Sequence, residues 1–396
     1  MKKQILYNLS IRLMAISILF LTINNQSAAQ NRAHQDPFLK IVAGPYLQHV
    51  TQTSITIMWE TNLPASSVVE YGEQDPLNNS FRSATMKTIH EIVLTALKPQ
   101  TNYHYRVISS DSSGDCAASD CYTFQTSVKE RSPFSFIVIG DSRTYPLRFK
   151  RISELLYSER PNFVLHLGDV VSNGNIKSQW INEYLDPASC FMHYIPTYVA
   201  IGNHERNSHW YYDYVSYPDP ENYYSFCYGN AEFFIVDTNI DFKKGSKQYI
   251  WLEHALSDSK AKWKFVAHHH PLFSSDSNDY GNTKTTYSTL GDTSVRKLAS
   301  LYERHDVDIV WYGHIHTYER TWPIKEGKVD LKDGVIYIQA GGGGAELEEF
   351  APTRSWFTAK ILRNWHYCLV NIFDNVVQIM CYDIDGKLYD FLELKK

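Results

Sequence analysis

Five short apolar runs, each followed by a side chain that can bind a metal ion, constrain the fold of this chain more than any other feature of its sequence. The runs are residues 134–139, 162–167, 196–201, 263–267 and 309–312. Strands that are apolar along their whole length are typical of a sheet covered on both faces. In α/β proteins, binding sites form at the carboxyl ends of such strands. We therefore expect an α/β domain in which the residues after the five runs meet at one site.

The residues that follow the runs form an ordered set of motifs. These are Gly140-Asp141, Gly168-Asp169, Gly202-Asn203-His204-Glu205, His268-His269-His270-Pro271 and Gly313-His314-Ile315-His316. One Gly-Asp pair alone is usually a turn, and one His-x-His pair is as often an ordinary polar pair as a metal site. Turns and ordinary polar pairs do not explain five such motifs in this order. Carboxylate, amide and imidazole ligands without cysteine suit Mn, Fe or Zn. Two such ions about 3.5–4 Å apart could clamp the attacking and leaving oxygens of an in-line displacement.

The motif order GD, GD, GNHE, HHP and GHIH resembles the calcineurin-like metallophosphoesterase superfamily. The longer ending GHIHTYER, together with the segment before the motifs, resembles the purple acid phosphatase branch. The resemblance covers roughly residues 40–390 and implies the metallophosphoesterase fold, an α/β fold with a four-layer β-sandwich flanked by helices. It also implies an N-terminal all-β sandwich of the immunoglobulin or fibronectin III type, which the turn signals and short alternating strands of residues 38–128 support.

The resemblance implies two metal ions, which could be Fe, Zn or Mn, and it assigns six ligands to them. Asp169 would bridge the two ions. The other ligands would be Asp141 and His316 for the first ion, and Asn203, His269 and His314 for the second. In the HHHP run the ligand of the family precedes the proline by two positions, which selects His269.

The resemblance also places catalytic groups beside the ligands. His204 would contact the phosphoryl group or the leaving oxygen, and the alternative is a hydrogen bond to Glu205 or to the backbone. His268 and His270, the neighbours of the ligand His269, are not expected to touch substrate.

Two positions depart from the family pattern. Ser172 stands where purple acid phosphatases carry a tyrosine that binds ferric iron, and Arg143 stands where other branches carry a histidine. The first ion therefore has three obvious protein ligands, and water, substrate or Ser172 would complete its coordination. We expect a weaker first site and no tyrosinate colour. Arg143 could bind phosphoryl oxygens through its forked donors, or it could form a salt bridge with a loop acid.

Segments outside the motifs divide the chain. Residues 1–29 have the charge, the short apolar run and the small residues of a signal peptide, with an uncleaved anchor as the alternative. We expect residues 38–128 to form the fibronectin III-like domain and residues 132–396 the catalytic domain. The signal peptide predicts a periplasmic or secreted bacterial protein. The net charge of −5 and the lack of a basic stripe argue against a nucleic-acid partner.

Four local features carry further expectations. The aromatic segment 210–224 either walls the substrate pocket or packs between the two domains, and the polar segment 274–289 is expected to be a loop beside the site. The glycine run 341–344 is expected to pack its backbone closely near the metals. A turn at Asp374-Asn375 would place Cys368 directly opposite Cys381, where a disulfide could form. Cys116 and Cys121 are close in a polar loop and could also form a bridge.

Together these patterns predict an exported, dinuclear metal-dependent phosphoesterase. The first choice is a phosphomonoesterase of the acid phosphatase type, in which a metal-bound hydroxide attacks a small phosphate ester in line. The alternatives are a phosphodiesterase, nucleotidase or pyrophosphatase on the same site, or an exported binding protein with weakened catalysis. The sequence leaves the oligomeric state open.

Overall fold

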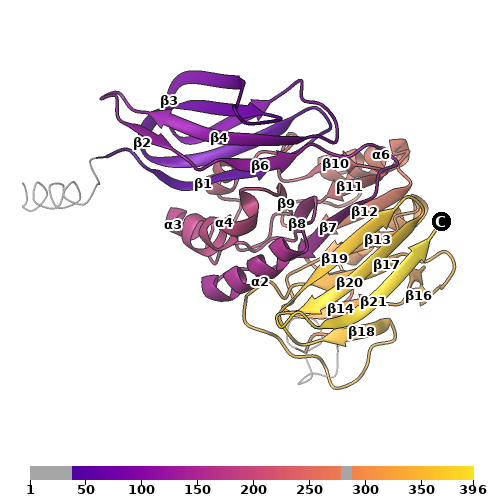
Figure 1. Cartoon of the computed structure of the whole chain (residues 1–396). Coiled ribbons are helices and arrows are strands. Elements are labelled where there is room, and N and C mark those ends of the chain that lie inside the picture. Colours follow the sequence, from indigo (N-terminus) through magenta and orange to yellow (C-terminus); the bar gives the residue numbers. More distant parts are fainter. Residues whose placement is uncertain (1–37, 278–287) are drawn as a thin grey trace, which may run out of the picture.

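The computed structural model describes residues 38–277 and 288–396, which form an all-β domain followed by an α/β domain. The expected signal peptide, and residues 278–287 of the expected polar loop, lie outside the described residues. Figure 1 shows the N-terminal strands lying across one end of the α/β domain. In the described part of the chain, no helix is both long enough and apolar enough to cross a membrane.

The N-terminal domain is built around two long strands that pair with each other, β2 (Ile55–Gly72) and β3 (Asn79–Leu94). Register irregularities between Glu60 and Ser67 divide β2, so that its first part pairs with β1 and its last part with β4. Trp59 is fully buried in the core of this domain and stacks on the ring of His90. The strands are β1 (Ile41–Gln48), β2 (Ile55–Gly72), β3 (Asn79–Leu94), β4 (Asn102–Ser110), β5 (Cys116–Ala118) and β6 (Tyr122–Gln125).

The α/β domain contains two large sheets, and the five predicted strands are divided between them. The first sheet has the order β21-β20-β19-β7-β8-β9, and the second has the order β10-β11-β12-β13-β17-β14-β18. The strands β7 to β9 are parallel neighbours, as are β12 and β13. The site-bearing strands are β7 (Phe134–Ile139), β8 (Phe163–His166), β9 (Thr197–Val199), β12 (Trp263–His268) and β13 (Ile309–Tyr312).

The remaining strands complete the two sheets and a small separate hairpin. They are β10 (Tyr224–Tyr228), β11 (Ala231–Ile235), β14 (Tyr318–Thr321), β15 (Ile324–Lys325), β16 (Lys328–Val329), β17 (Ile336–Ala340), β18 (Thr358–Leu362), β19 (His366–Phe373), β20 (Val376–Asp383) and β21 (Leu388–Lys395). The helical segments are α2 (Pro146–Ser158), α3 (Lys177–Gln179), η1 (Trp180–Leu185), α4 (Asp186–Met192), α5 (His209–Tyr214), α6 (Lys247–Asp258), η2 (Val295–Leu298) and α7 (Ala299–Arg304).

Aromatic rings from both sheets fill the space between them. Phe136 and Phe163 of the first sheet are stacked, with ring centroids 5.0 Å apart. Each also meets Phe233 of the second sheet edge-on, at 5.1 and 5.3 Å. Edge-to-face contacts at these distances add to the free energy that the buried aromatic surface contributes. This layer holds the two sheets face to face, so that the ends of their strands meet.

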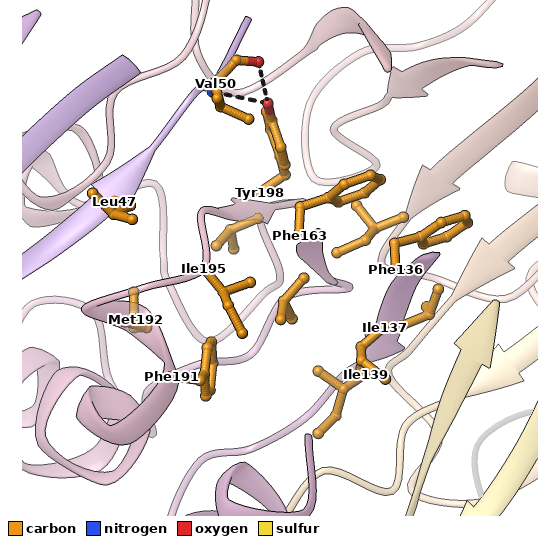
Figure 2. Close-up of a cluster of buried hydrophobic side chains, with 14 of the residues drawn as sticks. Leu47, Val50, Phe136, Ile137, Ile139, Phe163, Phe191, Met192, Ile195 and Tyr198 are labelled. Carbon is orange, nitrogen blue, oxygen red and sulfur yellow. Dashed lines mark hydrogen bonds between the residues drawn. The ribbon is translucent and has the colours of Figure 1, made fainter. Parts of the chain in front are cut away.

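A second packed region joins the two domains. Figure 2 shows Leu47 and Val50 on the side of the N-terminal domain and Tyr198, Phe191 and Met192 on the other. The Tyr198 hydroxyl donates to the Val50 carbonyl and accepts from its N–H, both at 3.0 Å. The α/β domain is therefore hydrogen-bonded directly to the sandwich.

The aromatic segment 210–224 belongs to this interface. Residues 209–214 form the helix α5, and the hydroxyl of the buried Tyr214 donates to Glu60 of β2 at 2.6 Å. Lys177 binds the other oxygen of Glu60 at 2.6 Å, and the Tyr46 hydroxyl donates to the Tyr214 carbonyl. Of the two expectations for this segment, the structure supports packing between domains.

The C-terminal hairpin has the predicted register, but it contains no disulfide. Phe373 pairs with Val376, and Cys368 lies directly opposite Cys381. Both thiols are buried and free, and a hydrogen bond joins them. Cys116 and Cys121 are also free, and both are exposed. The Cys116 thiol contacts the Ser110 hydroxyl on the paired strand β4. Neither of the two disulfides that the sequence left possible is formed in the structure.

Candidate metal centre

The ends of the five strands meet at one place, although the strands belong to two sheets. Asp141, Asp169 and Asn203 follow the parallel strands β7, β8 and β9 of the first sheet, and His269 and His314 follow β12 and β13 of the second. The loops approach so closely that a side chain does not fit between them. A Cβ atom on Gly313 would lie 2.5 Å from Oδ2 of Asp141. The glycine before the histidine motif therefore leaves room for the carboxylate of the opposite sheet.

The atoms expected to hold the second ion lie close together. Oδ1 of Asn203 is 3.0 Å from Nε2 of His269 and 3.1 Å from Nδ1 of His314, and these two nitrogens are 3.3 Å apart. Oδ1 of Asp169 is 3.4 Å from Nε2 of His269. Ligand atoms about 2.0–2.1 Å from one ion lie about 3.4 Å apart when their arrangement is tetrahedral. These four side chains therefore fit a single transition-metal ion.

The atoms expected to hold the first ion are less completely assembled. Oδ1 of Asp141 lies 3.6 Å from Nε2 of His316. Asp141 is fully buried, and its Oδ1 has no hydrogen-bond partner among the described residues. Suitable ligand atoms of Asp141, Asp169 and His269 all lie within 4.8 Å of one another. An unpartnered buried carboxylate oxygen beside a second carboxylate is a position that favours a cation.

Electrostatics at the centre agree with this. Burial raises the pKa of Asp141 well above its ordinary value; the charge of His269 opposes this shift, and the nearby Asp169 carboxylate adds to it. Two carboxylates in one buried site repel each other unless positive charge lies between them. Cationic groups are therefore required for both carboxylates to remain ionised.

Backbone hydrogen bonds orient the imidazoles. Nδ1 of His269 donates to the Leu167 carbonyl at 2.8 Å, and Nδ1 of His316 donates to the Glu346 carbonyl at 2.6 Å. Without a bound ion, the Asp169 and Asp141 carboxylates raise the pKa of His269. When either ring is neutral, its lone pair is on Nε2, which faces the centre. Such a partner on the far nitrogen selects the tautomer and the ring orientation of a metal-binding histidine.

Three of the expected ligands have an uncommon backbone conformation. The φ angles are 60° at Asp141, 57° at Asp169 and 71° at His314. Non-glycine residues seldom adopt positive φ, and such residues cluster at functional sites, where the surrounding structure offsets the cost. The sharp turn after each strand directs the next side chain into the centre.

Glu205 holds the backbone of the loops that carry the expected ligands, a role that the sequence analysis did not assign. Its fully buried carboxylate accepts the backbone N–H groups of Asp169 at 2.9 Å, Val170 at 2.7 Å and Gly202 at 2.6 Å. Burial raises the pKa of Glu205 to about 7, with a further contribution from Asp169. The carboxylate joins the loops after β8 and β9. Its position at the end of the GNHE motif was the only signal in the sequence.

His204 lies at the open side of the centre. Its Nδ1 donates to the Ser172 carbonyl at 2.7 Å, and its Nε2 lies 3.8 Å from Oδ2 of Asp169. The side chain is 27% exposed. The expected alternative, a hydrogen bond to the backbone, is present, and the same bond directs the other nitrogen towards the centre.

Arg143 also reaches the centre. Its Nε is 3.4 Å from Oδ2 of Asp169, and its Nη2 is 3.4 Å from Nε2 of His316. The expected salt bridge is therefore present, but its acid is the aspartate predicted to bridge the ions. Ser172, the second departure from the family pattern, donates its hydroxyl proton to Glu183 at 2.7 Å.

The two histidines that flank His269 have different surroundings. His268 is fully buried between the rings of Tyr302 and Tyr312, and burial lowers its pKa to about 3. It belongs to the core. His270 lies beside the centre, with its ring 4.6 Å from that of His314 and its Nδ1 2.8 Å from the Thr238 hydroxyl.

The glycine run 341–344 lies against the first strand end, as expected. The Gly343 N–H donates to the Gly140 carbonyl at 2.8 Å, and the Ala345 N–H donates to the Asp141 carbonyl at 2.9 Å. A Cβ atom on Gly341 would lie 2.9 Å from Oδ2 of Asp141. The run therefore packs its backbone against the loop that carries Asp141.

Comparisons with known proteins agree with both domains. Residues 134–318 match the calcineurin-like phosphoesterase family, and residues 44–126 match the purple acid phosphatase N-terminal domain. The structure of purple acid phosphatase PPD1 from yellow lupin seeds superposes with a TM-score of 0.77, covering 89% of this chain and 74% of that one. At 22% identity, this likeness shows the shared fold.

Similar sequences have varied names. The probable inactive purple acid phosphatase 1 of Arabidopsis thaliana is 28% identical over 78% of this chain and 58% of its own length. A nucleotide pyrophosphatase/phosphodiesterase of Hordeum vulgare is 27% identical over 58% of this chain and 70% of its own. Acid phosphatase type 7 of Danio rerio is 26% identical over 87% of this chain and 89% of its own length. The chain spans 50% to 58% of the length of three of the Arabidopsis relatives.

Proposed function

We propose that this chain, a purple acid phosphatase-like metallophosphoesterase, hydrolyses small phosphate monoesters at the centre formed by its strand ends. The observation that carries the proposal is the convergence of Asp169, Asn203, His269 and His314, whose ligand atoms lie 3.0 to 3.4 Å from their nearest partners. Apolar residues 13–23 support the further proposal that the protein is exported.

The family uses a centre of two metal ions. In this chain Asp169, Asn203, His269 and His314 would hold one ion, and Asp141, His316 and Asp169 are the residues available to the other. A metal ion bound there would lower the pKa of water to supply the nucleophile, and would polarise a phosphoryl oxygen.

Arg143 and His204 act on the substrate in this proposal. Both reach Oδ2 of Asp169 from the open side, and their side chains are 19% and 27% exposed. The guanidinium group can donate two parallel hydrogen bonds to phosphoryl oxygens, which suits a group with several charged oxygens.

His204 is placed to protonate the leaving oxygen. Its Nδ1–H is held by the Ser172 carbonyl, so a proton gained by the ring must reside on Nε2, which faces the centre. That proton can pass to the leaving alkoxide while the bond to Ser172 holds the ring in position.

A substrate panel tests the proposal. We expect protein loaded with Mn²⁺, Fe²⁺ or Zn²⁺ to cleave p-nitrophenyl phosphate faster than its bis-ester or a nucleotide, and Asp169→Ala to abolish turnover. Arg151→Ala, which changes an exposed side chain of α2, is the matched control and should behave as the unaltered protein.

Two other outcomes would redirect the proposal. Preference for the bis-ester or for nucleotides would favour the activity named for the Hordeum vulgare relative. Binding of phosphate esters without turnover at any metal loading would favour an exported binding protein, in line with the relatives named as inactive.

A further inference from the structure

The guanidinium group of Arg143 lies against two of the three residues available to the first ion. Its Nη2 is 3.4 Å from Nε2 of His316, and its Nε is 3.4 Å from Oδ2 of Asp169. These are the two atoms that would face an ion shared by His316 and Asp169. Oδ1 of Asp169 faces the opposite side, towards His269.

The hydrogen bonds of His316 make this contact a donor–acceptor pair. Its Nδ1 carries the proton that is donated to the Glu346 carbonyl. The Nε2 atom of the neutral ring is therefore an acceptor, and an arginine can only donate. The same lone pair cannot bind a metal ion and accept from Arg143, so the two interactions exclude each other.

Ser172 does not replace the lost ligand atoms. The Ser172 hydroxyl donates to Glu183 and lies 2.9 Å from the Thr144 hydroxyl. Oδ1 of Asp141 is the remaining ligand atom of the first set, and it has no hydrogen-bond partner among the described residues. Metal sites in proteins normally have three or more protein ligands. One carboxylate oxygen beside a fixed cation does not fit a tightly held second ion.

We propose that Arg143 occupies the position of the first ion and supplies its positive charge, so that the protein holds a single ion at Asp169, Asn203, His269 and His314. This inference rests on the metal centre of the proposed function and specifies its occupancy. The arginine would then have two roles in one place: it balances the charge of Asp169 and offers donors to the phosphoryl group.

The ratio of metal to protein tests this inference. Protein saturated with Mn²⁺ and freed of loose metal by gel filtration should retain about one ion per chain by elemental analysis. Arg143→Ala removes the competing cation and should retain about two, whereas Arg143→Lys keeps the charge and should retain about one. Arg151→Ala, the exposed control, should match the unaltered protein. Two ions in the unaltered protein, or one in Arg143→Ala, would overturn the inference.

Electron paramagnetic resonance gives a second readout that does not depend on turnover. The unaltered protein should show the spectrum of an isolated Mn²⁺ ion, and Arg143→Ala the spectrum of an exchange-coupled pair. A coupled pair in the unaltered protein contradicts the assignment to Arg143 even if phosphate esters are cleaved. One isolated ion without turnover leaves the assignment intact and removes the proposed function.

Discussion

At the residue scale, His204 combines a fixed nitrogen with a free one. The Ser172 carbonyl holds Nδ1 at 2.7 Å, and Nε2 faces the centre. A general acid of this kind matters most when the leaving oxygen is strongly basic, because such an oxygen cannot depart without a proton. The side chain should therefore have different importance for different esters.

We expect His204→Ala to lower kcat for an alkyl phosphate by about 10²–10⁴-fold. The loss should be much smaller with p-nitrophenyl phosphate, whose leaving group departs as a stable anion. Steady-state kinetics on the two substrates measure the difference. Equal losses on both would show that His204 positions the substrate and does not transfer a proton.

Glu205 acts through the backbone of the ligands. Its Oε2 accepts from Asp169 and Gly202, and its Oε1 accepts from Val170. In Glu205→Gln, the single amide oxygen can still accept from the N–H groups of Asp169 and Gly202. The NH₂ group then faces the Val170 N–H and cannot accept its hydrogen bond. We expect the Kd for Mn²⁺ to rise about 10–100-fold, the usual effect of removing a group that orients ligands. Titration calorimetry measures it, with the exposed Glu154→Gln as control. An unchanged Kd would limit Glu205 to a role in folding.

Single residues also mark the limit of what the sequence predicts. The motif order predicted six ligands through its resemblance to the family, and the structure brings these side chains close together at the strand ends. It did not predict that Arg143 would face His316, since these residues are 173 positions apart. It also did not identify Glu205 as an acceptor for three backbone groups, because such bonds depend on how two loops meet.

At the scale of elements, the layer of aromatic rings between the sheets sets the position of the strand ends. Phe163 contacts Phe136 within its own sheet and Phe233 across the gap. Phe163→Ala should lower the free energy of unfolding by about 3–5 kcal/mol, the usual cost of such a cavity. Urea unfolding measures it. Phe81→Ala, at a ring that is 42% exposed, should change the value by less than about 0.5 kcal/mol. Similar losses in the two variants would contradict this role.

The strands were predictable from their apolar runs, but their assignment to sheets was not. Runs 134–139 and 263–267 are alike in composition, yet β7 and β12 lie in different sheets. The grouping depends on long-range pairing, and no local pattern encodes it. For the same reason the short helix α5, which overlaps the start of the aromatic segment 210–224, was not expected, since its rings are placed by the neighbouring domain.

At the scale of the whole molecule, buried neutral histidines link stability to pH. His90 is fully buried in the N-terminal domain, where it contacts the hydroxyls of Thr61 and Ser67 at 2.9 and 2.7 Å. Burial, with a smaller contribution from Lys87, lowers its pKa from 6.5 to about 4. The unfolded chain therefore binds a proton at a higher pH than the folded chain does.

The sign of this linkage gives a specific expectation. The contribution of His90 is fully present above about pH 6.5, is lost as the pH falls towards about 4, and amounts to on the order of 3 kcal/mol. In His90→Gln, the free energy of unfolding should fall less steeply between these pH values. The difference in slope should correspond to the uptake of about one proton on unfolding. Urea titrations across this range measure it, and parallel slopes would contradict the assignment.

The bond between Tyr198 and Val50 connects the sandwich to a strand that leads into the centre. Tyr198 lies on β9, and Asn203 follows that strand. Restraining Asn203 with a bound ion should therefore slow local opening as far away as Val50, which follows β1. In hydrogen–deuterium exchange, the Val50 amide should exchange more slowly in the metal-loaded protein than after chelation. The appended domain would then report whether the distant centre is filled.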